Sequence, residues 1–176
     1  AGIDDSLQWY NAALTLGVLN GTPPPRELII NCAARMFIAG QGTEAQELVT
    51  RVLAADPEDV GAHFVRLSLG RVQGDPAAEE GARRQAVIAL TNRFTEVARA
   101  AGDTNATTRP YTDAPPIIPP DPVATANRVL ARQDPELTGA FVAAASDLAF
   151  LHLFFLEAPG PAADLIEGVR KAVPAD

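Results

Sequence analysis

The chain has 176 residues, of which 47% are hydrophobic and 20% charged, a composition typical of soluble globular proteins that excludes a disordered or collagen-like chain. The formal net charge is -8 and no run of Lys or Arg occurs, which argues against nucleic acid and anionic membrane surfaces as partners. The single cysteine, Cys32, excludes an internal disulfide and a cysteine-rich zinc site.

Strand signals are almost absent, while apolar residues recur three and four positions apart between prolines and glycines, so we predict an all-α chain. Asp56 and Asp75 are expected to cap helices whose first residues are Pro57 and Pro76, and Thr43 is expected to cap the helix before them. The helices expected in this part of the chain span residues 4–19, 26–39, 43–55, 58–73 and 76–101.

Small residues stand at regular positions between residues 26 and 59. Ala33 lies in the first helix of this segment, Gly40 in the turn, Ala45 in the second helix, and Pro57 closes it. This spacing resembles the tetratricopeptide repeat (TPR), a 34-residue pair of antiparallel helices. One repeat length later, the QGD sequence at 73–75 matches the next turn. The resemblance over 26–75 implies that residues 1–101 form hairpins stacked as a short right-handed solenoid.

A proline-rich segment follows at residues 102–121, where helices must stop because proline lacks a backbone donor. A loop of this length is either a flexible linker or a functional loop. Within it, Ile117 and Ile118 stand between prolines, which suggests that they dock on something. We favour the interpretation that they cover the protein's own core over the alternative of a partner-binding motif.

The C-terminal residues 122–176 are expected to form three helices, at 122–132, 135–157 and 161–173, which pack on the same domain. The last of these resembles the helix at 43–55: with a shift of 117 positions, Ala45, Leu48, Val52 and Pro57 correspond to Ala162, Leu165, Val169 and Pro174. Residues 135–176 therefore form a weaker match to the repeat.

The helix at 135–157 is apolar on every face and nearly long enough to span a bilayer. Asp147 and His152 offset much of the gain of membrane insertion, so we expect a buried central helix, with membrane contact through this helix not excluded. Its end, at Phe154 and Phe155, is a candidate interface for self-association or for a larger assembly.

Nothing in the sequence predicts an active site, a metal site or a cofactor site. The only histidines are His63 and His152, and no cluster of His, Cys or carboxylates has metal-ligand spacing. Ser146, Asp147 and His152 cannot act as a triad, since neighbours at these offsets on one helix point in different directions. His152 is expected to be a core histidine with its polar atoms satisfied.

The sequence therefore predicts a module that binds another protein or peptide, as a scaffold or accessory subunit. The TPR resemblance implies a groove lined by first-helix residues: Glu27, Ile30, Asn31, Ala34, Phe37, Ile38, Phe64, Ser68 and Arg71. The alternative is an all-α enzyme or small-molecule-binding domain with a cavity between the two halves, in which Asp147 and His152 are the polar anchors. No signal-peptide pattern is present, so we expect a cytoplasmic protein, or a periplasmic or secreted one if a signal segment has been removed.

Overall fold

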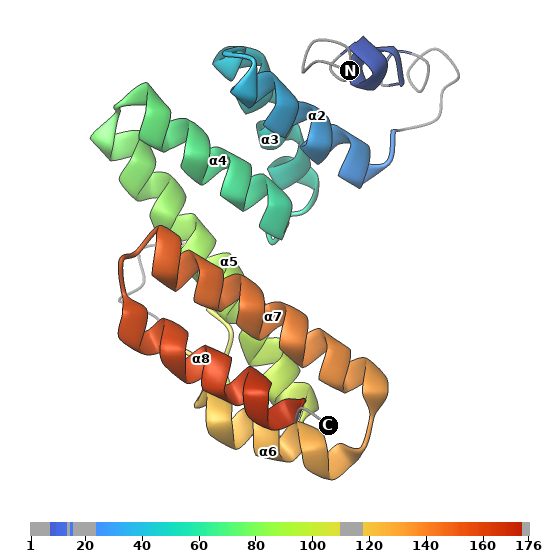
Figure 1. Cartoon of the computed structure of the whole chain (residues 1–176), viewed down its shortest axis with the longest axis vertical. Helices are drawn as coiled ribbons and strands as arrows, with labels where there is room; N and C mark the ends of the chain where they lie inside the picture. The colour runs from blue at the N-terminus through green and yellow to red at the C-terminus, as the bar shows by residue number, and fades with distance from the viewer. Residues whose placement is uncertain (1–7, 14, 16–23, 110–117, 174–176) are drawn as a thin grey trace. The chain divides into compact units, whose positions relative to one another are not determined.

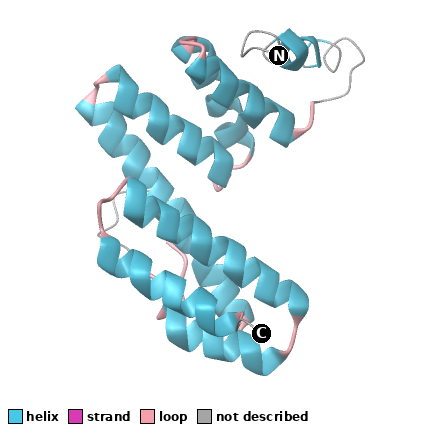
Figure 2. Ribbon diagram, viewed as in Figure 1, coloured by secondary structure: helices cyan, strands magenta, loops and turns pink. Residues whose placement is uncertain are grey.

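The computed structural model describes residues 8–13, 15, 24–109 and 118–173 (Figure 1). Within these ranges every regular element is a helix, which confirms the predicted all-α class (Figure 2). Residues 8–13 are helical, and the remainder of the first predicted helix lies, apart from Thr15, outside the described part. The other helices are α2 (Arg26–Ile38), α3 (Gly42–Ala55), α4 (Val60–Gln73), α5 (Pro76–Ala100), α6 (Pro122–Arg132), α7 (Pro135–Phe154) and α8 (Pro159–Ala172).

Aspartates before prolines begin three of these helices. The Asp75 carboxylate accepts from the amides of Ala77 and Ala78, which confirms its predicted role as a cap. Asp121 and Asp134 play the same part before Pro122 and Pro135. Each carboxylate satisfies amides that have no partner inside the helix, and it lies at the positive end of the helix dipole.

Two predicted caps were wrong. Helix α4 begins at Val60 with Asp59 as its N-cap, whereas Asp56 accepts from the amide of Glu58 in the turn before it. Helix α3 begins at Gly42, so Thr43 lies inside the helix. The predicted end of α7 at residue 157 was also too late: the helix stops at Phe154, and Glu157 has a φ of 52°, a left-handed conformation that cannot continue a helix.

The chain divides into two compact units, Ala1–Ala82 and Arg83–Asp176. The boundary between the two units lies inside α5. The helices after residue 122 share a unit with most of α5 and not with α2 to α4. The physical reason is visible at Phe94 of α5, whose buried ring lies 5.8 Å from the ring of Phe141 of α7.

In the first unit, α2 contacts both α3 and α4, and α3 contacts α4. Small residues allow these close contacts: Cys32 and Ala33 of α2, Ala45 of α3 and Ala62 of α4 are all fully buried. Val49 and Val52 of α3, Met36 of α2 and Leu69 of α4 complete the core.

In the second unit, α8 contacts α6 and α7, and α6 contacts α7. The approach of α8 to α6 depends on Gly168, because a Cβ atom there would lie 2.9 Å from the carbonyl oxygen of Pro122. The buried residues of α7 recur at helical spacing, so one stripe of this helix faces the core; they include Phe141, Ala145, Leu148 and Leu151.

Candidate functional site

The predicted groove residues lie on α2 and α4, two helices of the first unit that contact each other directly. Their approach depends on Gly61, since a Cβ atom there would lie 3.0 Å from the Cγ2 atom of Ile30. We call the surface of these two helices the α2–α4 face. It comprises Glu27, Ile30, Asn31, Ala34, Phe37, Ile38, Phe64, Ser68 and Arg71.

The α2–α4 face combines apolar side chains with a few polar ones. Ile38 is 56% exposed, whereas Ile30 and Phe37 are half-buried and pack against the core of the unit. Ser68 donates its hydroxyl to the carbonyl of Phe64 in the preceding turn, so that group is already engaged within α4. Glu27, Asn31 and Arg71 are exposed, so the face carries polar as well as apolar area.

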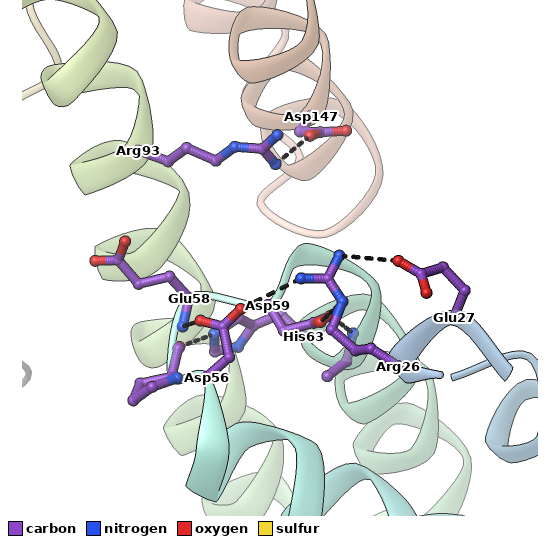
Figure 3. A network of polar contacts seen from close by, with 10 residues as sticks. Arg26, Glu27, Asp56, Glu58, Asp59, His63, Arg93 and Asp147 are labelled. Carbon is purple, nitrogen blue, oxygen red and sulfur yellow. Dashed lines mark hydrogen bonds and ion pairs between the residues drawn. The ribbon is translucent and has the colours of Figure 1, made fainter. Parts of the chain in front are cut away.

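A polar network holds the start of α2 to the turn between α3 and α4. Figure 3 shows Arg26 between Glu27, Asp56 and Asp59. Arg26 Nη1 donates to Asp56 Oδ2 at 3.3 Å, and Arg26 Nε lies 2.9 Å from Asp59 Oδ2. The second contact is an ion pair that lacks the alignment of a hydrogen bond. Since only 2% of the Asp59 side chain is exposed, the arginine supplies the charge that makes this buried carboxylate tolerable.

His63 extends this network into the core of the first unit. Its Nε2 lies 2.8 Å from the carbonyl oxygen of Pro57, which can only accept, so Nε2 carries the proton and donates. Its Nδ1 lies 3.3 Å from Nη2 of Arg66 and must accept. Burial lowers the pKa of His63, the Pro57 hydrogen bond opposes this shift, and the Arg66 charge lowers the pKa further. His63 is therefore a neutral structural residue near neutral pH.

Asp147 and His152 of α7 lie in different surroundings. Asp147 Oδ2 accepts from Arg93 Nη1 of α5 at 3.0 Å (Figure 3). Burial raises the pKa of Asp147, and the Arg93 charge opposes that rise. His152 lies five residues further along the helix, and its buried Nδ1 has no hydrogen-bond partner among the described residues. The prediction that this histidine is fully satisfied was therefore wrong.

Most of α7 is less buried than predicted. By length and composition alone it could cross a membrane, and only 33% of its most apolar window is buried within the protein. Phe154 is 52% exposed and its ring lies 4.6 Å from that of Phe150, which is also exposed. Phe155 is half-buried, with its ring 6.1 Å from that of Phe150. An interface at this end of α7 stays a prediction.

The loop after α5 forms a second polar site, which was not predicted. Asn92 of α5 holds the backbone of Arg109 through both ends of its amide. A pocket of about 240 Å³ lies beside this contact, with Thr95, Arg109, Ile118 and Pro120 among its lining residues. Ile118 is 89% exposed, so the expectation that it covers the core was wrong, and Ile117 lies outside the described residues.

A sequence signal for Asn92 does exist. Polar residues at positions 91, 92 and 95 interrupt the buried apolar stripe of α5, and buried polar groups need partners.

Across the described ranges, no group of three or more His, Cys, Asp or Glu side chains could hold a metal ion.

No protein family, curated protein or solved structure matches this chain. The resemblance to TPR proteins thus depends on the residues and on the helix contacts alone.

Proposed function

We propose that this chain is a TPR-like interaction module, a scaffold or accessory subunit, and that the α2–α4 face binds a protein partner. The observation that carries the proposal is the direct contact between α2 and α4 across the glycine at position 61. Two helices one repeat apart lie against each other, as a stacked hairpin array requires.

The packing of α3 supports the same proposal. Helix α3 contacts both α2 and α4. The small residues Ala33 and Ala45 are fully buried, and the TPR motif has small residues at these positions. The α2–α4 face is one surface of this unit that carries exposed and half-buried apolar side chains, as at Ile38 and Phe37. Such a surface is suited to an apolar anchor of a partner.

Photo-crosslinking tests this proposal. A benzophenone amino acid is placed at Asn31 or Ile38 on the α2–α4 face, or at the exposed Glu47 on α3 as the matched control. We expect a crosslink to one specific protein from Asn31 and Ile38 that unlabelled protein competes away, with none from Glu47. If the captured protein is a second copy of this chain, the face mediates self-association.

A point substitution gives an independent measurement. Ile38→Glu should reduce capture at least about tenfold, because it places a charge in the apolar contact, whereas Glu47→Gln should have no effect. Equal crosslinking from all three positions, or capture unchanged by Ile38→Glu, would refute the proposed face.

A further inference from the structure

The exposed residues of α7 form one stripe along the helix. They recur alternately four and three positions apart, a spacing that keeps side chains on the same side of a helix. These residues are Gly139, Ala143, Ser146, Phe150 and Leu153, with Ala140 and Phe154 beside them. We call this surface the α7 stripe. From position 139 to position 153 it extends about 21 Å along the helix axis.

The α7 stripe carries no charge. Among its residues only Ser146 is polar, and Phe150 and Phe154 are 44% and 52% exposed. Asp147 borders the stripe, but its charge is countered within the chain, since Arg93 Nη1 donates to its Oδ2 at 3.0 Å. Each chain has a net charge of -8, so two copies meet with the least like-charge repulsion at an uncharged surface.

The two halves of the α7 stripe differ in side-chain size. The first half holds only small residues, and the second half holds only large apolar ones. The small residues are Gly139, Ala140, Ala143 and Ser146, and the large ones are Phe150, Leu153 and Phe154. A Cβ atom at Gly139 would meet nothing within 4 Å, so the space beside the small half is open. The rings of Phe150 and Phe154 lie 4.6 Å apart and form one ridge on the large half.

A second copy of α7 in the antiparallel direction complements this difference in size. Positions 139 and 153 are both seven residues from Ser146, so a two-fold axis near Ser146 brings position 139 of one copy opposite position 153 of the other. The large half of each copy then covers the small half of its partner, and both use the same surface, as two-fold symmetry requires. A parallel pair would instead place Phe150 against the same residue of the other copy and leave a gap between the small halves, which close packing disfavours.

We propose that two copies of this chain associate through the α7 stripe as an antiparallel dimer with its two-fold axis near Ser146. Phe150 and Phe154 are each about half exposed, and an aromatic side chain buries about 150–250 Å², so the two together contribute roughly 150–250 Å² per copy. A contact of one helix with another is smaller than the about 800 Å² per partner of a stable complex, so we expect a weak dimer with a Kd on the order of 10–100 μM. This surface lies in the second unit and does not depend on the α2–α4 face.

Sedimentation equilibrium of the unmodified full chain tests the association, with concentrations from about 1 to about 500 μM that bracket the expected Kd. The mean mass should rise from that of one chain towards that of two. Ala143→Glu should raise the Kd at least about tenfold, because it places a charge opposite an apolar side chain of the partner. Ala131→Glu changes an exposed alanine of α6 in the same unit and is the matched control, which should dimerise like the unmodified chain. Circular dichroism checks that both variants keep their helices.

Single cysteines in a Cys32→Ala background test the direction of the pairing. In the antiparallel dimer, position 139 of one copy is about 21 Å along the helix axis from position 139 of the other, but it lies beside position 153. A short bismaleimide should therefore link a Gly139→Cys chain to a tagged Leu153→Cys chain, and neither chain to its own kind. Gly81→Cys is the matched control, since Gly81 is also exposed and a Cβ atom there meets nothing within 4 Å.

Four outcomes would overturn the proposal. The first is a chain that stays monomeric at about 500 μM, well above the expected Kd. The second is a Kd that Ala143→Glu and Ala131→Glu change equally. The third is linking of Gly139→Cys chains to each other, or linking to Leu153→Cys that is no more frequent than from Gly81→Cys. The fourth is a monomer that sediments with neutral phosphatidylcholine vesicles, which would assign the α7 stripe to a lipid surface instead.

Discussion

Gly168 and Gly139 offer a matched pair of glycine-to-alanine substitutions in the second unit. A Cβ atom at Gly168 of α8 would lie 2.9 Å from the oxygen and 3.1 Å from the carbonyl carbon of Pro122, both backbone atoms that cannot rotate away. At Gly139 of α7, a Cβ atom would meet nothing within 4 Å. The same chemical change therefore creates a clash in one helix and none in the other.

The expected magnitudes follow from this difference. Alanine is favoured over glycine inside a helix by up to about 1 kcal/mol, so Gly139→Ala should raise the free energy of unfolding by about 0.5–1 kcal/mol. Gly168→Ala receives the same benefit but must push α6 away from α8, and overpacking of this kind costs about 1–3 kcal/mol. The two variants should thus differ by about 1–3 kcal/mol, with Gly168→Ala the less stable.

Urea denaturation followed by circular dichroism at 222 nm measures both effects on the same cooperative unit. The comparison is between midpoints, with the slope of the transition as a check that the unfolded state is unchanged. Equal midpoints for the two variants would refute the reasoning, since they would show that α8 does not approach the start of α6 closely.

Three further predictions concern the first unit. Ala45→Leu should cost about 1–3 kcal/mol of unfolding free energy, because Ala45 is fully buried between helices, and an unchanged denaturation midpoint would contradict this. Asp59→Ala should lower the free energy of unfolding by about 1–2 kcal/mol, because the helix cap is lost. Asp59→Asn can still cap α4 and should lower it by less than about 1 kcal/mol. Equal losses for the two variants would show that the charge of Asp59, and not capping, is its main role. Since the pKa of His63 is lowered on folding, the unfolded chain binds the proton more readily. The contribution of His63 to stability should therefore be constant above about pH 6.5 and should fall as the pH drops below it. His63→Gln should flatten that fall, leaving the part that comes from His152, whose pKa burial also lowers.

The helix pattern was predictable because its signals are local. Asp75 and Pro76 stand side by side, and the cap they form needs nothing beyond the next three residues. The start of α4 was misplaced because two aspartates compete in the sequence DPED. Both aspartates contact Arg26 at the start of α2, which is far from them in the sequence.

The two candidate sites differ in the same way: residues on one could be named from the sequence, whereas the other joins residues that no sequence pattern relates. The members of the α2–α4 face were named from the resemblance to the TPR repeat, before their burial was known. Asn92 and Arg109 are joined through a loop without periodicity, and no pattern relates the two positions. The unit boundary inside α5 was also not predictable, because no proline or capping residue interrupts the helix there.

The alkylation rate of the single cysteine, Cys32, can report on local opening of the first unit. Cys32 is fully buried in α2, its Sγ lies 3.7 Å from Oδ1 of Asn11, and burial raises its pKa, so the folded state should resist alkylation. Labelling must then wait for an opening of the first unit that exposes Cys32. Each 1.4 kcal/mol of opening free energy lowers the labelling rate of Cys32 about tenfold. The rate at which a thiol-reactive dye labels the unmodified chain therefore measures how often the first unit opens. A partner that stabilises this unit should lower the labelling rate.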